Sequence, residues 1–213
     1  MAATSCSWDL APHRSLTGSA SWAGRALWGT PTSFFGVRRS TPARAPARRS
    51  FRRCRWLFDA YAPYTREQIG EERLAWLHDL PAELQINGIA IVHASPGDLW
   101  RAPMPDASDR DLDATYRPLD TSTVAYGHIH RPFIRAIGGL VVANAGSAGM
   151  PWDDDARASY LLVEDGRVEV IRVDYDVDAE VREFQSCAHP DSERLVEMRR
   201  VGRFIAPNPF PLP

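Results

Sequence analysis

The stretch AYGHIHRP, residues 125–132, decides how the chain is interpreted, because two histidines follow directly on a β-prone run. That run ends at Tyr126, and Gly127 permits a tight turn before His128 and His130. Residues i and i+2 of an extended segment point the same way, so the spacing predicts two imidazoles facing one cavity. Imidazole is a good ligand for divalent transition metals. Two ordinary hydrogen-bonded histidines at a strand end remain the structural alternative.

A third histidine occupies an equivalent position after an earlier β-prone run. His93 lies in IVHASPG, residues 91–97, directly after an apolar run over residues 89–92. Sites in open α/β sheets form where loops leave the carboxyl ends of strands. We therefore expect His93 to join His128 and His130, although a lone histidine at a strand end is more often a hydrogen-bonded structural residue.

Turn signals divide the rest of the ordered sequence into short elements. Thr65 and Gln68 have capping-box spacing and predict a helix that ends at Pro81. Asn87-Gly88 predicts a type I′ turn between strands over residues 84–86 and 89–92. A surface helix follows Ser108. Further strands are expected over residues 121–126, 133–137 and 140–144, a hairpin over 159–163 and 168–175, and a helix over 192–200.

The combination of motifs resembles a known family. IVHASPG (91–97), AYGHIHRP (125–132), GLVVANAGS (139–147) and RASYLLV (157–163) stand in the order and spacing of the last motifs of calcineurin-like metallophosphoesterases, in particular their small bacterial phosphodiesterase branch. The resemblance implies an α/β fold, a four-layer αββα sandwich, with this chain supplying the distal half. It also implies a metal-dependent phosphoesterase acting on phosphodiester or nucleotide-like substrates.

The same resemblance implies roles for individual residues. Members of the family hold two divalent ions, Mn, Fe, Zn or Ni, that share a bridging carboxylate. By this resemblance His93 and His128 would bind one metal ion and His130 the other. Arg131 and Asn144 would bind the phosphoester substrate. Asn144 begins the sequence Asn-Ala-Gly-Ser, where the family usually has Asn-Pro-Gly-Ser.

Other motifs of the family are not found in this sequence. Asp-x-His, Gly-Asp-x-x-Asp and Gly-Asn-His followed by an acid supply most of the metal ligands and the acid histidine, and none of them precedes Tyr61. We therefore expect a truncated and impaired enzyme whose N-terminal half is missing or replaced, and we assign no catalytic residue. Three neutral imidazoles without a bridging carboxylate predict weak metal binding.

Residues 1–56 differ sharply in composition from the remainder. They hold ten Arg and a single acid, Asp9, whereas the remainder holds fifteen Arg and twenty-six acids. This composition has three interpretations: a sequence translated from a wrong reading frame or start codon, a targeting segment, or a basic arm that binds nucleic acid. On each of them the segment stays outside the core. The expected division is a non-native or disordered segment over 1–56, the distal half-domain over 57–183, and a C-terminal tail over 184–213.

The overall composition excludes some partners. The 213 residues carry a formal net charge of −2 and no apolar run long enough to span a membrane. We expect a cytoplasmic protein with a phosphoester substrate and no membrane partner. A nucleic-acid partner is not favoured, although a basic arm would supply one, and the formation of homo-oligomers stays open. A non-catalytic interaction module built on the same fold is the alternative function.

Overall fold

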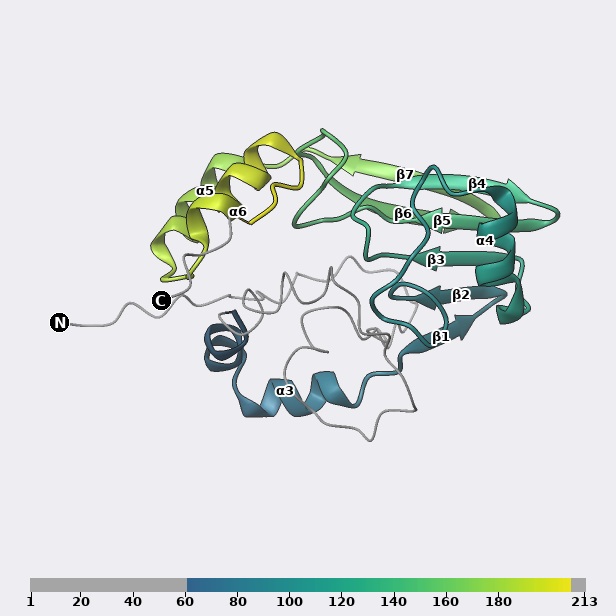
Figure 1. The fold of residues 1–213 in the computed structure, drawn as a ribbon, viewed down its shortest axis with the longest axis horizontal. Coiled ribbons are helices and arrows are strands. Elements are labelled where there is room, and N and C mark those ends of the chain that lie inside the picture. The colour runs from purple at the N-terminus through teal and green to yellow at the C-terminus, as the bar shows by residue number, and fades with distance from the viewer. Residues whose placement is uncertain (1–60, 208–213) are drawn as a thin grey trace, which may run out of the picture.

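Two β-sheets and flanking helices make up the fold in the computed structural model, which describes residues 61–207 (Figure 1). The interpretation of residues 1–56 lies outside these residues. Because strands and helices are mixed along the chain, the α/β class expected from the sequence is confirmed.

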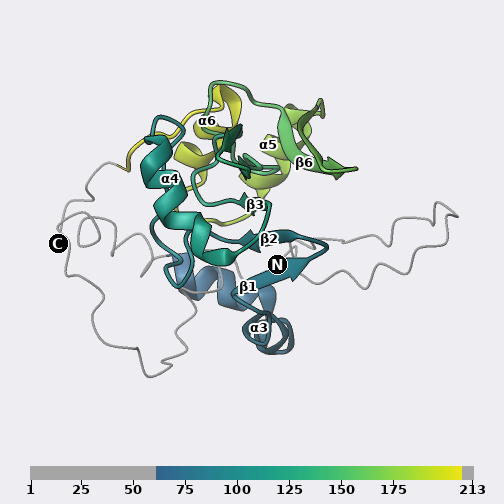
Figure 2. The same ribbon diagram turned by 90° about the vertical axis from the view of Figure 1, so that its right-hand side faces the viewer.

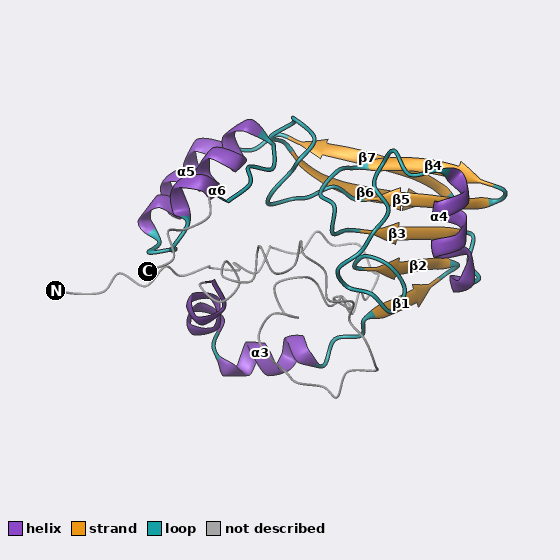
Figure 3. Ribbon diagram, viewed as in Figure 1, coloured by secondary structure: helices purple, strands orange, loops and turns teal. Residues whose placement is uncertain are grey.

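The main sheet has five strands in the order β1-β2-β3-β5-β4 (Figure 3). The three central strands, β2, β3 and β5, are parallel to one another. The outer strands β1 and β4 are antiparallel to their neighbours. The bounds are β1 Glu83–Ile86, β2 Ile89–Val92, β3 Thr123–Tyr126, β4 Phe133–Ile137 and β5 Leu140–Asn144.

Turn chemistry explains why the hairpins fall where the sequence predicted them. Asn87 and Gly88 have φ of 51° and 78°, which are the two positive values that a type I′ turn needs. The β1–β2 hairpin is therefore confirmed. The β4–β5 hairpin is confirmed in the same way at Gly138 and Gly139.

Helix α4, Asp109–Tyr116, runs across one face of the main sheet (Figure 2). Its expected N-cap is confirmed, because the backbone N–H of Asp111 donates to Ser108 Oγ at 3.1 Å. Leu112 and Tyr116 are completely buried against the sheet. A 3₁₀ turn, Arg117–Leu119, then leads to β3. The core of the molecule lies between this helix and the apolar residues of β2, β3 and β5.

Strands β6, Ala158–Glu164, and β7, Arg167–Val173, form a separate two-stranded antiparallel sheet. The predicted hairpin across Asp165 and Gly166 is confirmed, with φ of 49° and 76° at these residues. Strand β7 contacts β4 of the main sheet. Four-layer stacking of the whole fold stays a prediction.

The first helical region differs from the one predicted. Residues 61–69 are already helical, Gly70 interrupts the helix with φ of 77°, and α3 follows at Glu71–His78. The assignment of Thr65 as an N-cap is wrong, because its Oγ1 donates to the carbonyl of Tyr61 at 3.0 Å from inside the helix. A threonine within a helix commonly bonds back to the carbonyl four residues earlier.

Two helices end the described chain, α5 at Val177–Ser186 and α6 at Ser192–Val201, and they pack against each other (Figure 1). Helix α6 was predicted, whereas α5 was not, and α5 crosses the expected domain boundary at residue 183. Asp176 caps α5 by accepting from the N–H of Ala179 at 2.8 Å. None of the helices in residues 61–207 is long and apolar enough to cross a membrane.

Candidate metal centre

The predicted site lies at one edge of the main sheet, where three parallel strands end side by side. In the strand register Val92 pairs with Tyr126, and Tyr126 pairs with Asn144. The loops that follow β2 and β3 therefore leave the sheet side by side. The backbone N–H of Gly127 donates to the carbonyl of His93 at 3.1 Å and continues this pairing one step beyond the strands.

His93 and His128 come together at this edge, as the sequence predicted. Nε2 of His93 lies 3.2 Å from Nδ1 of His128, and the two rings meet edge to face at a centroid distance of 5.1 Å. Two imidazole nitrogens bound to one tetrahedral ion at 2.0–2.1 Å would stand about 3.3 Å apart. The observed separation therefore fits either a hydrogen bond between the two rings or two ligands of a single metal ion.

The route by which the pair forms differs from the one predicted. His128 and His130 have φ of 64° and 55°, so the Gly-His-Ile-His segment is not extended and the i, i+2 argument fails. Left-handed residues turn the chain twice within four residues. Ile129 is buried between the two histidines, with an exposed fraction of 5%. A tight turn is present, but it is centred on His128 and not on Gly127: the N–H of Ile129 donates to the carbonyl of Gly127 at 2.7 Å, and His128, not the glycine, has the positive φ.

His130 is held by a different set of contacts. Its Nδ1 lies 2.6 Å from the carbonyl oxygen of Met150, and its ring stacks on Trp152 at 4.2 Å. Because a carbonyl only accepts hydrogen bonds, Nδ1 must carry the proton and Nε2 keeps its lone pair in the neutral ring. A backbone carbonyl bonded in this way commonly fixes the tautomer of a metal-binding histidine.

Burial favours the neutral form of all three imidazoles by lowering their pKa. Burial, followed by the charges of His128 and His130, lowers the pKa of His93 from 6.5 to about 4. Burial also lowers the pKa of His128, against opposing effects of the Trp100 backbone and Asp98. The pKa of His130 is lowered by burial and by the charge of His128, while its bond to Met150 opposes the shift. Neutral imidazole is the form that binds metal.

Only part of a set of metal ligands is in place. Within residues 61–207, no group of three or more His, Cys, Asp or Glu side chains stands in a geometry that could hold an ion. The His93–His128 pair fits two positions on one ion, and no carboxylate of the described residues completes the set. Two of the three predicted histidines therefore pair directly, and His130 lies close enough to affect the pKa of His93.

The two residues expected to bind substrate are placed differently. Arg131 is exposed and its Nε donates to the carbonyl of Trp152 at 2.9 Å. Asn144 is completely buried. Its Nδ2 donates to the carbonyl of Gly127 at 2.6 Å, and its Oδ1 accepts from the N–H of Gly146 at 2.9 Å. Asn144 thus ties the histidine loop to the loop after β5, and substrate contact by both residues stays a prediction.

Sequence reasoning missed the residues that support the histidines. Asp98 and Trp100, in the loop after His93, affect the pKa of His128. Met150 and Trp152, in the loop after Ser147, contact His130 through a hydrogen bond and a ring stack. In the sequence, these supporting residues stand out only as polar or aromatic residues that follow a motif closely. Such a signal does not indicate which histidine the residue contacts, because the loops meet only in the fold.

These features define a mixed α/β protein with a histidine site at the carboxyl ends of parallel strands. Residues 65–166 match the family model described as the calcineurin-like phosphoesterase superfamily domain, so this segment belongs to that superfamily. The family expected from the motifs is confirmed.

Solved structures show the same fold. A metallophosphoesterase from Sphaerobacter thermophilus is 24% identical with a TM-score of 0.62, over 83% of this chain and 76% of that chain. A hypothetical protein from Pyrococcus horikoshii OT3 is 20% identical with a TM-score of 0.63, over 81% of this chain and 71% of that chain. No curated protein matches the chain.

Proposed function

We propose that this site is a reduced metallophosphoesterase centre, which binds one divalent ion and a phosphoester but turns substrate over poorly. The observation that carries the proposal is the 3.2 Å separation of His93 Nε2 and His128 Nδ1 within a segment that belongs to the superfamily. Mn²⁺, Fe²⁺, Zn²⁺ or Ni²⁺ suits imidazole ligands. Phosphodiester or nucleotide-like compounds are the substrate class that the family resemblance implies.

Each residue of the centre has a defined task in this proposal. His93 and His128 bind the ion through facing nitrogens, and His130 offers Nε2 because its Nδ1–H is engaged by Met150. Asn144 holds the histidine loop in place by donating a hydrogen bond to the Gly127 carbonyl. A bound divalent ion would supply Lewis-acid polarisation of the phosphoryl oxygen and a lowered pKa of water.

Impaired turnover follows from the ligand count. A pair of dications needs anionic oxygen ligands to offset its charge, and the three histidines bring none. The chain also has no match to the family motif that carries the acid histidine. General acid catalysis is worth about 10² to 10⁴ in rate, so its loss alone would reduce turnover strongly.

Hydrolysis of bis(p-nitrophenyl) phosphate with added Mn²⁺ tests the proposal. We expect the 213-residue chain to be no faster than a His128→Ala, His130→Ala variant, while only the parent chain retains Mn²⁺ in equilibrium dialysis. His78→Ala, on α3 and away from the centre, is the matched histidine control and should retain Mn²⁺. Robust turnover that the double substitution abolishes would show that further ligands reach the site, and would contradict the proposed impairment.

An interaction module is the second candidate. Tyr160 and Leu162 alternate along β6 on one face, with exposed fractions of 48% and 41%, which is high for large apolar side chains. If Mn²⁺ retention does not depend on the histidines, this candidate replaces the metal centre. Light scattering of the parent chain and a Tyr160→Ser, Leu162→Ser variant then tests whether this face joins two copies.

A further inference from the structure

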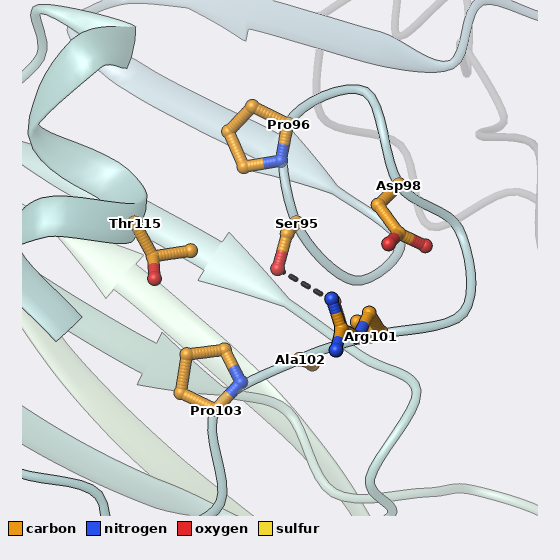
Figure 4. A pocket seen from close by; sticks show the side chains of 7 residues that line it. All are labelled: Ser95, Pro96, Asp98, Arg101, Ala102, Pro103 and Thr115. Atoms are coloured by element: carbon orange, nitrogen blue, oxygen red, sulfur yellow. Dashed lines mark hydrogen bonds between the residues drawn. The ribbon is translucent and has the colours of Figure 1, made fainter. Parts of the chain in front are cut away.

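An open pocket of about 400 Å³ is lined by residues of the loop that follows β2 and His93 (Figure 4). Its walls come from the loop after β2 and from Thr115 in the last turn of α4. Ser95, Pro96 and Asp98 form one side, and Thr115 of α4 faces them. The remaining lining residues are Arg101, Ala102 and Pro103.

Buried tyrosines and backbone bonds fix the shape of this pocket. The Tyr116 hydroxyl donates to the carbonyl of Ala94 at 2.8 Å, and the Tyr126 hydroxyl donates to the carbonyl of Pro103 at 2.7 Å. Ser95 and Asp98 exchange two backbone hydrogen bonds of 3.0 Å. Both ends of the loop are therefore anchored to the core, so the pocket is largely preformed before any ligand arrives.

Most polar groups of the pocket are already engaged. Ser95 Oγ donates to the Arg101 carbonyl at 2.5 Å, and Thr115 Oγ1 donates to the Asp111 carbonyl at 2.7 Å. Asp98 Oδ1 accepts from the N–H of Trp100 at 2.8 Å. The guanidinium of Arg101 is exposed and makes no hydrogen bond or ion pair within residues 61–207. It is thus the cation that this pocket offers to a ligand.

The pocket and the histidine centre share the loop after β2, in which Ser95 follows His93 by two residues and Asp98 follows it by five. The carboxylate lines the pocket, and its charge also acts on the ring of His128. Trp100, two residues further along the loop, bonds to the same ring through its backbone. A phosphoryl group at His93 and His128 would therefore leave the rest of its molecule next to Arg101.

We propose that this pocket binds the alcohol portion of the phosphoester, and that Arg101 selects substrates that carry a second anionic group there. This inference rests on the proposed function of the histidine centre. A guanidinium recognises a phosphate or a carboxylate through paired N–H donors. The ligand class is accordingly a phosphoester with a second phosphate or carboxylate on its alcohol portion.

Isothermal titration of the Mn²⁺-loaded 213-residue chain with glucose 6-phosphate and glucose 1,6-bisphosphate tests the inference. We expect the bisphosphate to bind about tenfold more tightly, which is the scale of one charged hydrogen-bonded contact. Arg101→Gln should remove this preference and leave the affinity for glucose 6-phosphate nearly unchanged. Arg110→Gln, on the exposed side of α4 and outside the pocket, is the matched control and should keep the preference.

The outcomes separate this inference from the proposed function. Equal affinity for the two sugars, or a preference that survives Arg101→Gln, would overturn the role of Arg101. Loss of binding to both sugars in the His128→Ala, His130→Ala variant supports the metal centre. If that variant binds both sugars as before while Arg101→Gln still abolishes the preference, the pocket stands and the proposed metal centre fails.

Discussion

His93 Nε2 lies 3.2 Å from His128 Nδ1, although 35 residues separate the two histidines in the chain. The contact exists because β2 and β3 are parallel neighbours that end in register at Val92 and Tyr126. Parallel pairing brings the residues after both strands to the same edge of the sheet. A hydrogen atom or a metal ion can occupy the space between the facing nitrogens, so the pair is the natural place to test metal binding.

The first prediction is that one divalent ion binds per chain and depends on both members of the pair. Removing a residue that only hydrogen-bonds to a metal ligand typically weakens metal binding about 10- to 100-fold. His93→Ala and His128→Ala each remove a ligand itself, so each should weaken Zn²⁺ binding by more than that in equilibrium dialysis. His78→Ala should bind like the parent chain. Equal Zn²⁺ affinity in all three variants would place the metal elsewhere in the chain.

The second prediction concerns stability and pH. The pKa of His93 is lowered to about 4 in the fold, against 6.5 in the unfolded chain. Between these values the unfolded chain takes up a proton that the folded chain does not, so the free energy of unfolding must fall as the pH falls from 6.5 to about 4. Urea denaturation at half-unit pH steps should show this slope.

His93→Gln is the variant that isolates the effect. Glutamine keeps a neutral polar side chain and does not titrate, so the slope between pH 6.5 and about 4 should become shallower. It should not vanish, because burial also lowers the pKa of His128 and His130. An unchanged slope in His93→Gln would mean that His93 takes up its proton equally in both states.

Local turn chemistry accounts for the parts of the fold that the sequence predicted. Asn87-Gly88 and Asp165-Gly166 allow positive φ at two consecutive residues, and both hairpins form at these positions. Ser108 caps α4 because its side chain reaches the N–H three residues later. In each case the deciding interaction lies within four residues, so the amino-acid sequence alone contains it.

The parts of the fold that the sequence did not predict depend on contacts between residues far apart in the chain, or on where a helix begins. Thr65 has capping-box spacing, yet the helix already includes residue 61, so the local signal gave a false boundary. Helix α5 had a usable signal in Asp176 and its acidic first turn, which was missed. The stacking of His130 on Trp152 joins residues of two different loops, and no spacing rule indicates it.

A third prediction tests whether Asn144 supports the centre. Asn144→Asp keeps an oxygen for the N–H of Gly146 but replaces the Nδ2 donor that bonds to the carbonyl of Gly127. Because this side chain is completely buried, the change sets a carboxylate oxygen against the Gly127 carbonyl, which keeps only its bond from the N–H of Ile129, and introduces a buried charge. We expect a loss of about 3 kcal/mol in the free energy of unfolding at neutral pH, measured in urea.

The same variant should also weaken Zn²⁺ binding, because the Gly127 carbonyl that Asn144 holds lies next to His128. Asn87→Asp is the matched control. Asn87 is exposed with φ of 51°, a conformation that aspartate also tolerates, so stability should change little. Equal stability of the two variants would show that the Asn144 contacts carry no weight.

The last prediction concerns Gly146, which closes the loop after β5. Its φ is 70°, and an added Cβ would lie 2.1 Å from Ser159 Oγ and 3.0 Å from Pro132 Cδ. Ser159 cannot move away easily, because its Oγ accepts from the N–H of Ser147 at 3.0 Å and donates to the carbonyl of Ala145 at 2.8 Å. Gly146→Ala therefore combines backbone strain with a steric clash.

Gly139→Ala separates these two costs. Gly139 has φ of 82° but open space where an added methyl group would lie, so its substitution should cost only the backbone strain of about 1–2 kcal/mol. Gly146→Ala should cost about 1–3 kcal/mol more, the usual penalty for overpacking, and should lower Tm further than Gly139→Ala. Equal losses in thermal denaturation of the two variants would show that Ser159 and Pro132 yield without cost. A larger loss at Gly146 would establish that the loop after β5 is packed tightly against Ser159 of β6 and Pro132.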